Sequence, residues 1–348
     1  MKKFLLGLAT LVLFASCSQN ETIEVSKGNA IEFQNAFVDN ATRSNVDPST
    51  TTANLQDFAV YGFMDEYTGK VFIDELVSAP SWTYSNTQYW TPNVYYFAAL
   101  APGNNSRQWT LEAANTDATA KRGIGVVSFT NDGTQDLLYW ADVFDNTAGA
   151  CQNNKVGITF NHLLSKVKFS FKNEFKNNNA SIIVKDIQIT NARTKGEIDL
   201  TSANWWSTPC WTFTNDTRAT FAFGDANSVY NGTSYDKVQD LGLQIPMNAE
   251  KESDKELLLF PETDAIINVT FTVELYFGNQ KAIGKTHNVS VTTTLNMGYC
   301  YDFKATLNSD NVDPDNQLKP IEFTVTAIKD WAQGGEVGVD VSNSTTQP

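Results

Sequence analysis

The chain has 348 residues and a formal net charge of −14, with 41% hydrophobic, 12% aromatic and only 18% charged residues. An acidic balance of this size excludes nucleic acid and anionic lipid headgroups as expected partners, because both would repel the protein. The hydrophobic fraction is sufficient for packed cores, and the length suits two domains of ~100–200 residues each.

Residues 1–16 have the pattern of a signal peptide. Lys2 and Lys3 give a positive start, and residues 4–15 form an apolar run that is shorter than the ~20 residues a membrane-spanning helix needs. Small residues precede Cys17, as they do where a lipoprotein signal peptidase cuts. We therefore expect cleavage before Cys17 and attachment of a lipid to its thiol, which would anchor the chain to a membrane.

The first strand pattern follows a polar stretch and covers residues 31–38. Ile31, Phe33 and Phe37 alternate with polar residues, which predicts a strand with one apolar face. Arg43 is the first arginine of the chain and stands between this strand and a polar segment, a setting open to a protease. A plain surface charge is the alternative interpretation of Arg43.

Period-two alternation recurs along the rest of the chain, with turn clusters of Asn, Asp and Gly between the apolar runs. It predicts strands at 58–63, 71–73, 95–100, 124–129, 156–160, 167–171, 182–190, 241–245, 267–275, 287–291 and 299–307. Many short strands with one apolar face predict an all-β protein of antiparallel β-sandwiches with few short helices. We expect a domain boundary near residue 164, with an N-terminal domain at 44–163 and a C-terminal domain at 164–348.

The C-terminal end predicts a hairpin over residues 320–342. Its first strand carries Ile321, Phe323 and Val325 at alternate positions, and its second strand carries Val337, Val339 and Val341. Each strand therefore has one apolar and one polar face. The simplest alternative for such a terminal hairpin is that it completes its own domain.

The sequence contains no recognisable catalytic motif. Its two histidines, His162 and His287, lack metal-ligand spacing, and neither a nucleophile elbow nor a phosphate-binding glycine loop occurs. We predict no enzymatic activity, no cofactor and no metal site, although a two-carboxylate glycosidase cannot be recognised from spacing alone. The three cysteines after Cys17 are an odd number and do not indicate a disulfide framework. A disulfide between one pair of them is the open alternative to free thiols. They are Cys151, Cys210 and Cys300.

Aromatic residues gather in two stretches of the chain. We expect most of them to pack in cores, whereas a carbohydrate-stacking surface would make the chain a surface glycan-binding lipoprotein of β-sandwich fold, which is the alternative function. The residues concerned are Trp82, Tyr84, Tyr89, Trp90, Tyr95 and Tyr96, followed by Trp205, Trp206 and Trp211.

Seven segments in order along nearly the whole chain resemble the fimbrillin family, the subunits of lipoprotein-derived pili in outer-membrane bacteria. None of these segments is a catalytic motif. They are Leu13–Asn20, Ile31–Phe33, Ala41–Ser44, Leu55–Phe63, Tyr89–Pro92, Phe160–Val167 and Lys319–Val325.

The resemblance implies two transthyretin-like β-sandwich domains and a structural or adhesive role in a surface fimbria at the outer membrane. It also implies that residues 17–43 are a lipidated tether and propeptide strand, which an arginine-specific protease removes by cutting at Arg43. The strand that carries Ile31, Phe33 and Phe37 would then be replaced by a donor strand, the 320–342 hairpin, from another subunit. The implied partners are other fimbrial subunits, the protease and a ligand on a host or bacterial surface.

Overall fold

The structure is a computed structural model that describes twelve segments of the chain. They are residues 29–38, 55–64, 71–114, 124–151, 154–177, 179–201, 210–223, 243–253, 255–278, 280–312, 319–329 and 344–345. Cys17, Arg43 and the three valines of the predicted second donor strand lie outside them. Within these segments the chain forms β-strands and no α-helix, so the all-β class is confirmed and the short helices are not found there. No helix in this part of the chain has the length and apolarity to cross a membrane.

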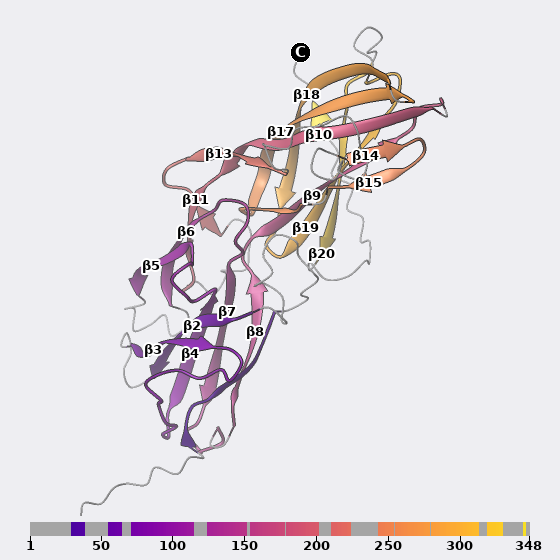
Figure 1. Cartoon of the computed structure of the whole chain (residues 1–348). Coiled ribbons are helices and arrows are strands. Elements are labelled where there is room, and N and C mark those ends of the chain that lie inside the picture. Colours follow the sequence, from indigo (N-terminus) through magenta and orange to yellow (C-terminus); the bar gives the residue numbers. More distant parts are fainter. Residues whose placement is uncertain are drawn as a thin grey trace, which may run out of the picture.

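The N-terminal half contains a six-stranded and a four-stranded sheet (Figure 1). The six-stranded sheet runs in the order β1 (Phe33–Val38), β8 (Val156–His162), β7 (Leu138–Asp145), β4 (Val94–Ala101), β2 (Asp57–Met64) and β3 (Val71–Ser78). The four-stranded sheet runs β12 (Trp211–Thr212), β11 (Lys195–Asp199), β6 (Gly125–Thr130) and β5 (Trp109–Ala114). β1 and β3 are therefore the edge strands of the larger sheet.

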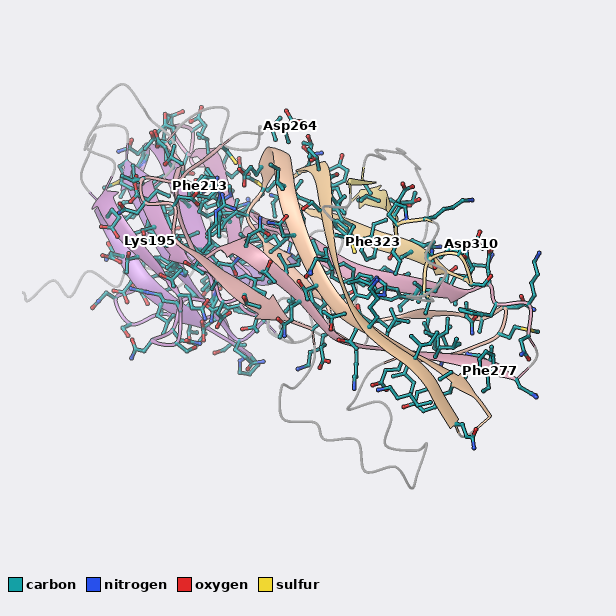
Figure 2. The ribbon with its side chains drawn as sticks, turned by 90° about the horizontal axis from the view of Figure 1, so that it is seen from above. Lys195, Phe213, Asp264, Phe277, Asp310 and Phe323 are labelled. Carbon is teal, nitrogen blue, oxygen red and sulfur yellow. The ribbon has the colours of Figure 1, made fainter. Side chains whose placement is uncertain are left out.

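The C-terminal half is a second sandwich. One sheet runs β13 (Arg218–Ala222), β10 (Ala180–Arg193), β17 (Glu262–Phe277), β18 (Gln280–Leu295) and β21 (Ser344–Thr345), with β14 (Leu243–Pro246) also paired to β10. The other runs β15 (Glu250–Glu252), β9 (Ser165–Asn173), β19 (Tyr299–Leu307) and β20 (Phe323–Lys329), with β16 (Leu257–Leu259) also on β9. Figure 2 shows Phe277 at the outer tip of the long β17–β18 hairpin and Asp264 at its other end.

Three apolar cores follow from these layers. One core lies between the two C-terminal sheets and includes Phe169, Phe271 and Phe323. A second lies between the two N-terminal sheets, and a third covers the opposite face of the six-stranded sheet. Because neighbouring residues of β2 point into different cores, β2 is buried on both faces.

The two halves are joined by two consecutive strands that pair in different halves. β10 pairs with β17 in the C-terminal sandwich, whereas β11, which follows after one residue, pairs with β6 in the N-terminal one. β11 and β12 therefore belong to an N-terminal sheet although they follow the predicted boundary near residue 164. The Leu258 N–H donates to the carbonyl of Gly133 over 2.9 Å, which adds a second link between the halves.

Two strand pairings differ from the antiparallel expectation. β1 is parallel to β8, and β9 is parallel to β19. The alternation of apolar residues predicts that a segment is a strand but carries no information on its partner or direction, so these long-range parallel pairings were not predicted.

Candidate functional site

The strand predicted to be removable comprises Ile31, Glu32 and the strand β1 that follows them, and its two apolar side chains that the structure describes, Ile31 and Phe33, are buried in the third core. Ile31 is 0% and Phe33 is 2% exposed, whereas Glu32 between them is exposed. The ring of Phe33 lies 6.1 Å from that of Phe58 on β2 and 5.9 Å from that of Phe97 on β4. The predicted inward face is therefore correct for these two residues. Phe37 pairs with Thr159 in the β1–β8 ladder.

Main-chain hydrogen bonds hold residues 29–32, which lead into the N-terminal end of β1. The Trp90 N–H donates to the Asn29 carbonyl over 2.7 Å, and the Ile31 N–H donates to the Gln88 carbonyl over 2.8 Å. On the other side, the Val156 N–H at the start of β8 donates to the Glu32 carbonyl over 2.7 Å. We call the segment Ser81–Trp90, which runs along this end of β1, the clasp.

Tyr84 is the central side chain of the clasp. Its hydroxyl donates to the Ile31 carbonyl over 2.9 Å and accepts the Gln88 N–H over 3.0 Å. Its ring lies 5.6 Å from that of Phe33. Burial raises the pKa of Tyr84, against the opposing effect of the Gln88 N–H, so the hydroxyl stays protonated and able to donate.

At the edge of the sheet, β1 depends on a small set of contacts. Within the described residues its ladder partner is β8, and the one ion pair is between Glu32 and Lys155, at 2.9 Å, with both side chains about half exposed. An exposed pair of this kind contributes less than about 1 kcal/mol. Burial of Ile31 and Phe33, at about 1.5–3 kcal/mol each, is the larger stabilising effect.

The predicted first donor strand lies inside its own domain in this structure. Ile321, Phe323 and Val325 are each at most 2% exposed and belong to the core between the C-terminal sheets. β20 pairs with β19 over seven residue pairs and is the edge strand of its sheet. This position agrees with the alternative that the segment completes its own domain, while its role as a donor stays a prediction.

Most aromatic residues that suggested a carbohydrate surface are core residues. Trp90 and Tyr95 are at most 3% exposed, and Trp82 and Tyr84 pack against the same core. Tyr89 is 42% exposed. In the second stretch Trp211 is buried, with its indole N–H donating to the Leu163 carbonyl over 3.1 Å; Trp205 and Trp206 lie outside the described residues.

The histidines and cysteines occupy structural positions. His162 is buried and bonds through Nδ1 to Asp136, and His287 is buried against the ring of Phe271, at 5.6 Å. Cys151, Cys210 and Cys300 are free thiols. Burial raises the pKa of Cys210 and of Cys300 to about 11, which keeps both protonated near neutral pH. No metal-binding group of three or more His, Cys, Asp or Glu side chains occurs in the described part of the chain.

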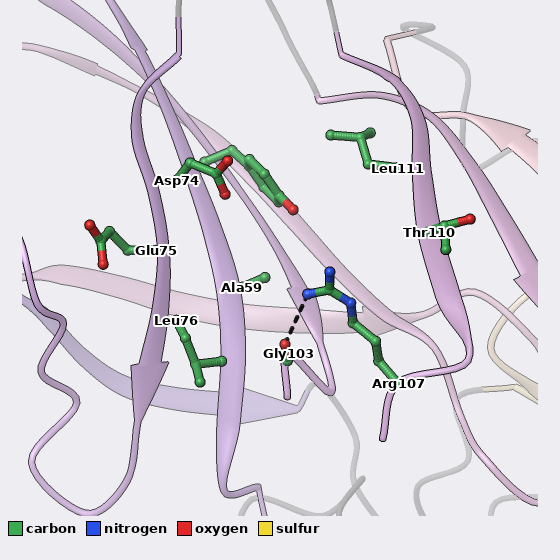
Figure 3. Close-up of a pocket in the computed structure, with 9 residues that line it drawn as sticks. Ala59, Asp74, Glu75, Leu76, Gly103, Arg107, Thr110 and Leu111 are labelled. Carbon is green, nitrogen blue, oxygen red and sulfur yellow. Dashed lines mark hydrogen bonds between the residues drawn. The ribbon is translucent and has the colours of Figure 1, made fainter. Parts of the chain in front are cut away.

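A hollow of about 440 Å³ opens between β3 and β5, the edge strands of the two N-terminal sheets (Figure 3). Arg107 donates from Nη1 to the Gly103 carbonyl over 3.0 Å and lies 4.2 Å above the Trp109 ring. Burial, together with the nearby charge of Asp74, raises the pKa of Tyr61 to about 12 despite the opposing effect of Arg107. These side chains offer hydrogen-bonding groups and no nucleophile paired with a base.

Several residues that hold β1 were not predicted as site residues. Gln88, Trp90 and Lys155 contact β1 from positions more than fifty residues away in sequence. Their contribution is mostly a main-chain group, which any residue type can supply, so residue identity could not have revealed them.

Comparisons with known proteins give the family. The fimbrillin-like family model matches residues 42–331. No curated protein matches the chain.

Solved structures with a similar arrangement are distant in sequence. A candidate cell adhesion protein from Bacteroides ovatus is 13% identical over 80% of this chain and 88% of that one, with a TM-score of 0.46. One from Bacteroides uniformis is 15% identical over 87% and 99%, with a TM-score of 0.45. The fimbrial anchor protein of Porphyromonas gingivalis is 9% identical over 78% and 88%, with a TM-score of 0.35. These likenesses are weak, so the assignment rests on the family model: the chain belongs to the fimbrillin-like family.

Proposed function

We propose that this chain is a structural or adhesive subunit of a bacterial surface fimbria, exported as a lipoprotein and polymerised by strand exchange. The observation that carries the proposal is the position of the edge strand β1 and of Ile31 just before it, because the buried side chains of Ile31 and Phe33 help fill an apolar core. Arg43 follows β1 closely in the sequence. A single cut there would separate β1 from the rest of the subunit.

Loss of β1 would leave a surface that favours a replacement strand. The N–H groups of Trp90 and Val156 and the hydroxyl of Tyr84 would lose their acceptors, and the rings of Phe58 and Phe97 would be uncovered. Unpaired strand edges with an adjacent apolar surface bind extended segments by β-strand addition. Another subunit that supplies such a segment would satisfy both requirements and form a fibre joint.

The donor in this proposal is the predicted hairpin at 320–342. Its first strand presents Ile321, Phe323 and Val325, and its second presents Val337, Val339 and Val341. Alternating apolar side chains let one face of an added strand enter a core while the other face stays in water.

Lipid attachment at Cys17 has a defined place in this sequence of events. The lipid would hold the subunit at the outer membrane while β1 keeps it monomeric. Because Cys17 and β1 both precede Arg43, the cut would separate anchor and strand from the subunit together. The proposed partners are thus other fimbrial subunits and an arginine-specific protease, with a surface ligand for an adhesive subunit.

The cleavage step can be tested with lipidated full-length chain on intact cells. Wild-type chain treated with an arginine-specific protease is expected to acquire Ser44 as its new N-terminus, detected by mass spectrometry. Arg43→Ala should keep its original N-terminus and its lipid. Arg122→Ala, which removes a different arginine, is the matched control and should be cut like wild type. Release of the lipid-bearing segment from Arg43→Ala at the wild-type rate would contradict the proposal.

A further inference from the structure

We propose that the surface vacated by β1 accepts the tripeptide Ile321-Glu322-Phe323 of a second copy of this chain, in the register of Ile31-Glu32-Phe33, with Tyr84 as the positioning residue. The inference rests on the proposed function and adds to it the identity of the segment and its register. It concerns residues 29–33, at the N-terminal end of the strand, because the structure describes the main-chain and side-chain contacts used in the comparison there.

The same three residues, Ile-Glu-Phe, occur at 31–33 and again at 321–323. The structure also gives the two tripeptides the same alternation of buried and exposed side chains. Ile31 and Ile321 are 0% and 1% exposed, Phe33 and Phe323 are 2% and 1% exposed, and the glutamate between them is exposed in both copies. The second tripeptide therefore already has the alternation that the vacated surface requires.

The main-chain requirements of the clasp are met by residues 319–322. The segment that leads into β1 accepts hydrogen bonds at the carbonyls of Asn29, Ile31 and Glu32 and donates one from the Ile31 N–H. In the proposed register these groups are the carbonyls of Lys319, Ile321 and Glu322 and the N–H of Ile321. The position of Ala30, whose N–H takes part in none of these four bonds, falls to Pro320, which has no N–H to offer.

Side-chain volume favours this tripeptide over the valines of the second donor strand. In β1, Phe33 has the rings of Phe58, Tyr84 and Phe97 within 6.1 Å. A phenylalanine in that place restores these contacts, whereas a valine leaves a cavity, which is destabilising in a packed core. Phe323 already packs among aromatic rings, 5.6 Å from Phe169 and 5.6 Å from Phe271.

Charge and main-chain geometry select the register. Glu322 would face Lys155, the present partner of Glu32 at 2.9 Å. The Tyr84 hydroxyl would donate to the Ile321 carbonyl, as it now does to that of Ile31. A shift by one residue would direct Glu322 into the apolar core, because successive side chains of a strand point to opposite faces.

To act as a donor, β20 must separate from β19. The tripeptide then leaves the aromatic core of its own domain and enters the one vacated by β1 in the second subunit. β20 is an edge strand with β19 as its described ladder partner. Among the described strands, it can therefore separate without breaking a ladder on its other side. The vacated surface of the second subunit, which has no strand until the tripeptide docks, offers contacts of the same kind as those that the donor's own core loses.

A peptide-binding experiment tests the inference. Full-length chain is cut at Arg43 in the presence of excess labelled peptide, and the bound peptide is measured. A peptide of residues 28–38 is the positive control, and the test peptide covers 319–329. We expect both to bind, Phe323→Ala to weaken the test peptide at least about 100-fold, and a peptide of residues 335–343 to bind at least tenfold more weakly. Tighter binding of 335–343 than of 319–329 would overturn the inference and leave the proposed function intact. Failure of the 28–38 peptide to bind would overturn both.

The register of the docked peptide and the role of Tyr84 are tested by disulfide cross-linking. The chain carries Cys151→Ser and Lys155→Cys, and the new cysteine at position 155 can form a disulfide with a cysteine in the peptide. A Glu322→Cys test peptide should cross-link well and a Thr324→Cys peptide poorly. Tyr84→Phe in the chain should weaken binding about fivefold, the effect of one hydrogen bond, and reduce the preference for position 322. An unchanged preference would show that Tyr84 does not set the register, and preferred cross-linking at 324 would overturn the register itself.

Discussion

Phe33 shows how a single side chain can hold a whole strand in place. It is 2% exposed and touches rings from β2, β4 and the clasp. We expect Phe33→Ala to lower the free energy of unfolding of the uncut chain by about 3–5 kcal/mol through lost burial and a cavity. Chemical denaturation monitored by tryptophan fluorescence measures this change.

Glu32→Ala is the matched control for Phe33→Ala, since Glu32 lies on the exposed face of the same strand. Its ion pair with Lys155 is about half exposed at both ends, so the loss should stay below about 1 kcal/mol. Equal effects of the two substitutions would contradict the orientation of β1.

His287 should make stability depend on pH. Burial, with a smaller effect of Lys285, lowers its pKa from 6.5 to about 4 in the folded chain. Between pH 6.5 and 4 the unfolded chain therefore binds more protons, and the stability contributed by neutral His287 falls as the pH falls. We expect His287→Gln to remove roughly 2–3 kcal/mol of this loss, measured as the difference between wild-type and variant stabilities at pH 7 and pH 4.

Thr286→Ala changes the exposed residue next to His287 and should retain the wild-type dependence on pH. If His287→Gln and wild type lost the same stability between pH 7 and pH 4, the histidine would not be held neutral by burial.

At the scale of elements, alternation predicted the strands more reliably than their partners. The prediction at 299–307 coincides with β19, and that at 267–275 falls inside the longer β17. β7, the central neighbour of β4, was missed. Its outer half carries Asp142 and Asp145 in place of a regular apolar alternation.

The β10–β11 junction is the element-scale feature that holds the two halves together. Arg193, the last residue of β10, binds Glu262 through Nε and Nη2, both at 2.9 Å, and Asp216 through Nη1. Its guanidinium also lies 4.2 Å over the Phe213 ring. One cation thus contacts two acidic groups and a ring.

Arg193→Ala should reduce the free energy of unfolding by about 1–3 kcal/mol, because the planar bidentate contact is lost and Glu262 is left without its partner. Arg193→Lys should recover only part of it, since an ammonium cannot form the same pair of bonds. Arg218→Ala, which removes a more exposed partner of Asp216, should cost less than about 1 kcal/mol. Equal losses for Arg193→Ala and Arg218→Ala in thermal unfolding would contradict a special role for the junction.

At the scale of the whole molecule, composition and alternation were sufficient for the all-β class, and the order of the recognised segments was sufficient for the family. The return of β11 and β12 to the N-terminal sheet was beyond prediction, because strand pairing between remote segments leaves no local pattern. The same applies to the site: the inward face of Ile31 and Phe33 follows from period-two alternation, whereas the clasp follows only from the fold.

In the proposed assembly, fibre formation is the molecular-scale consequence of cutting away the edge strand β1 and replacing it with a strand of another subunit. Negative-stain electron microscopy of purified full-length chain after arginine-specific proteolysis tests it most directly. We predict fibres from wild type and from Arg122→Ala, and monomers from Arg43→Ala. Fibres of wild-type length from Arg43→Ala, whose β1 remains joined to the subunit, would contradict strand exchange at β1 as the basis of assembly.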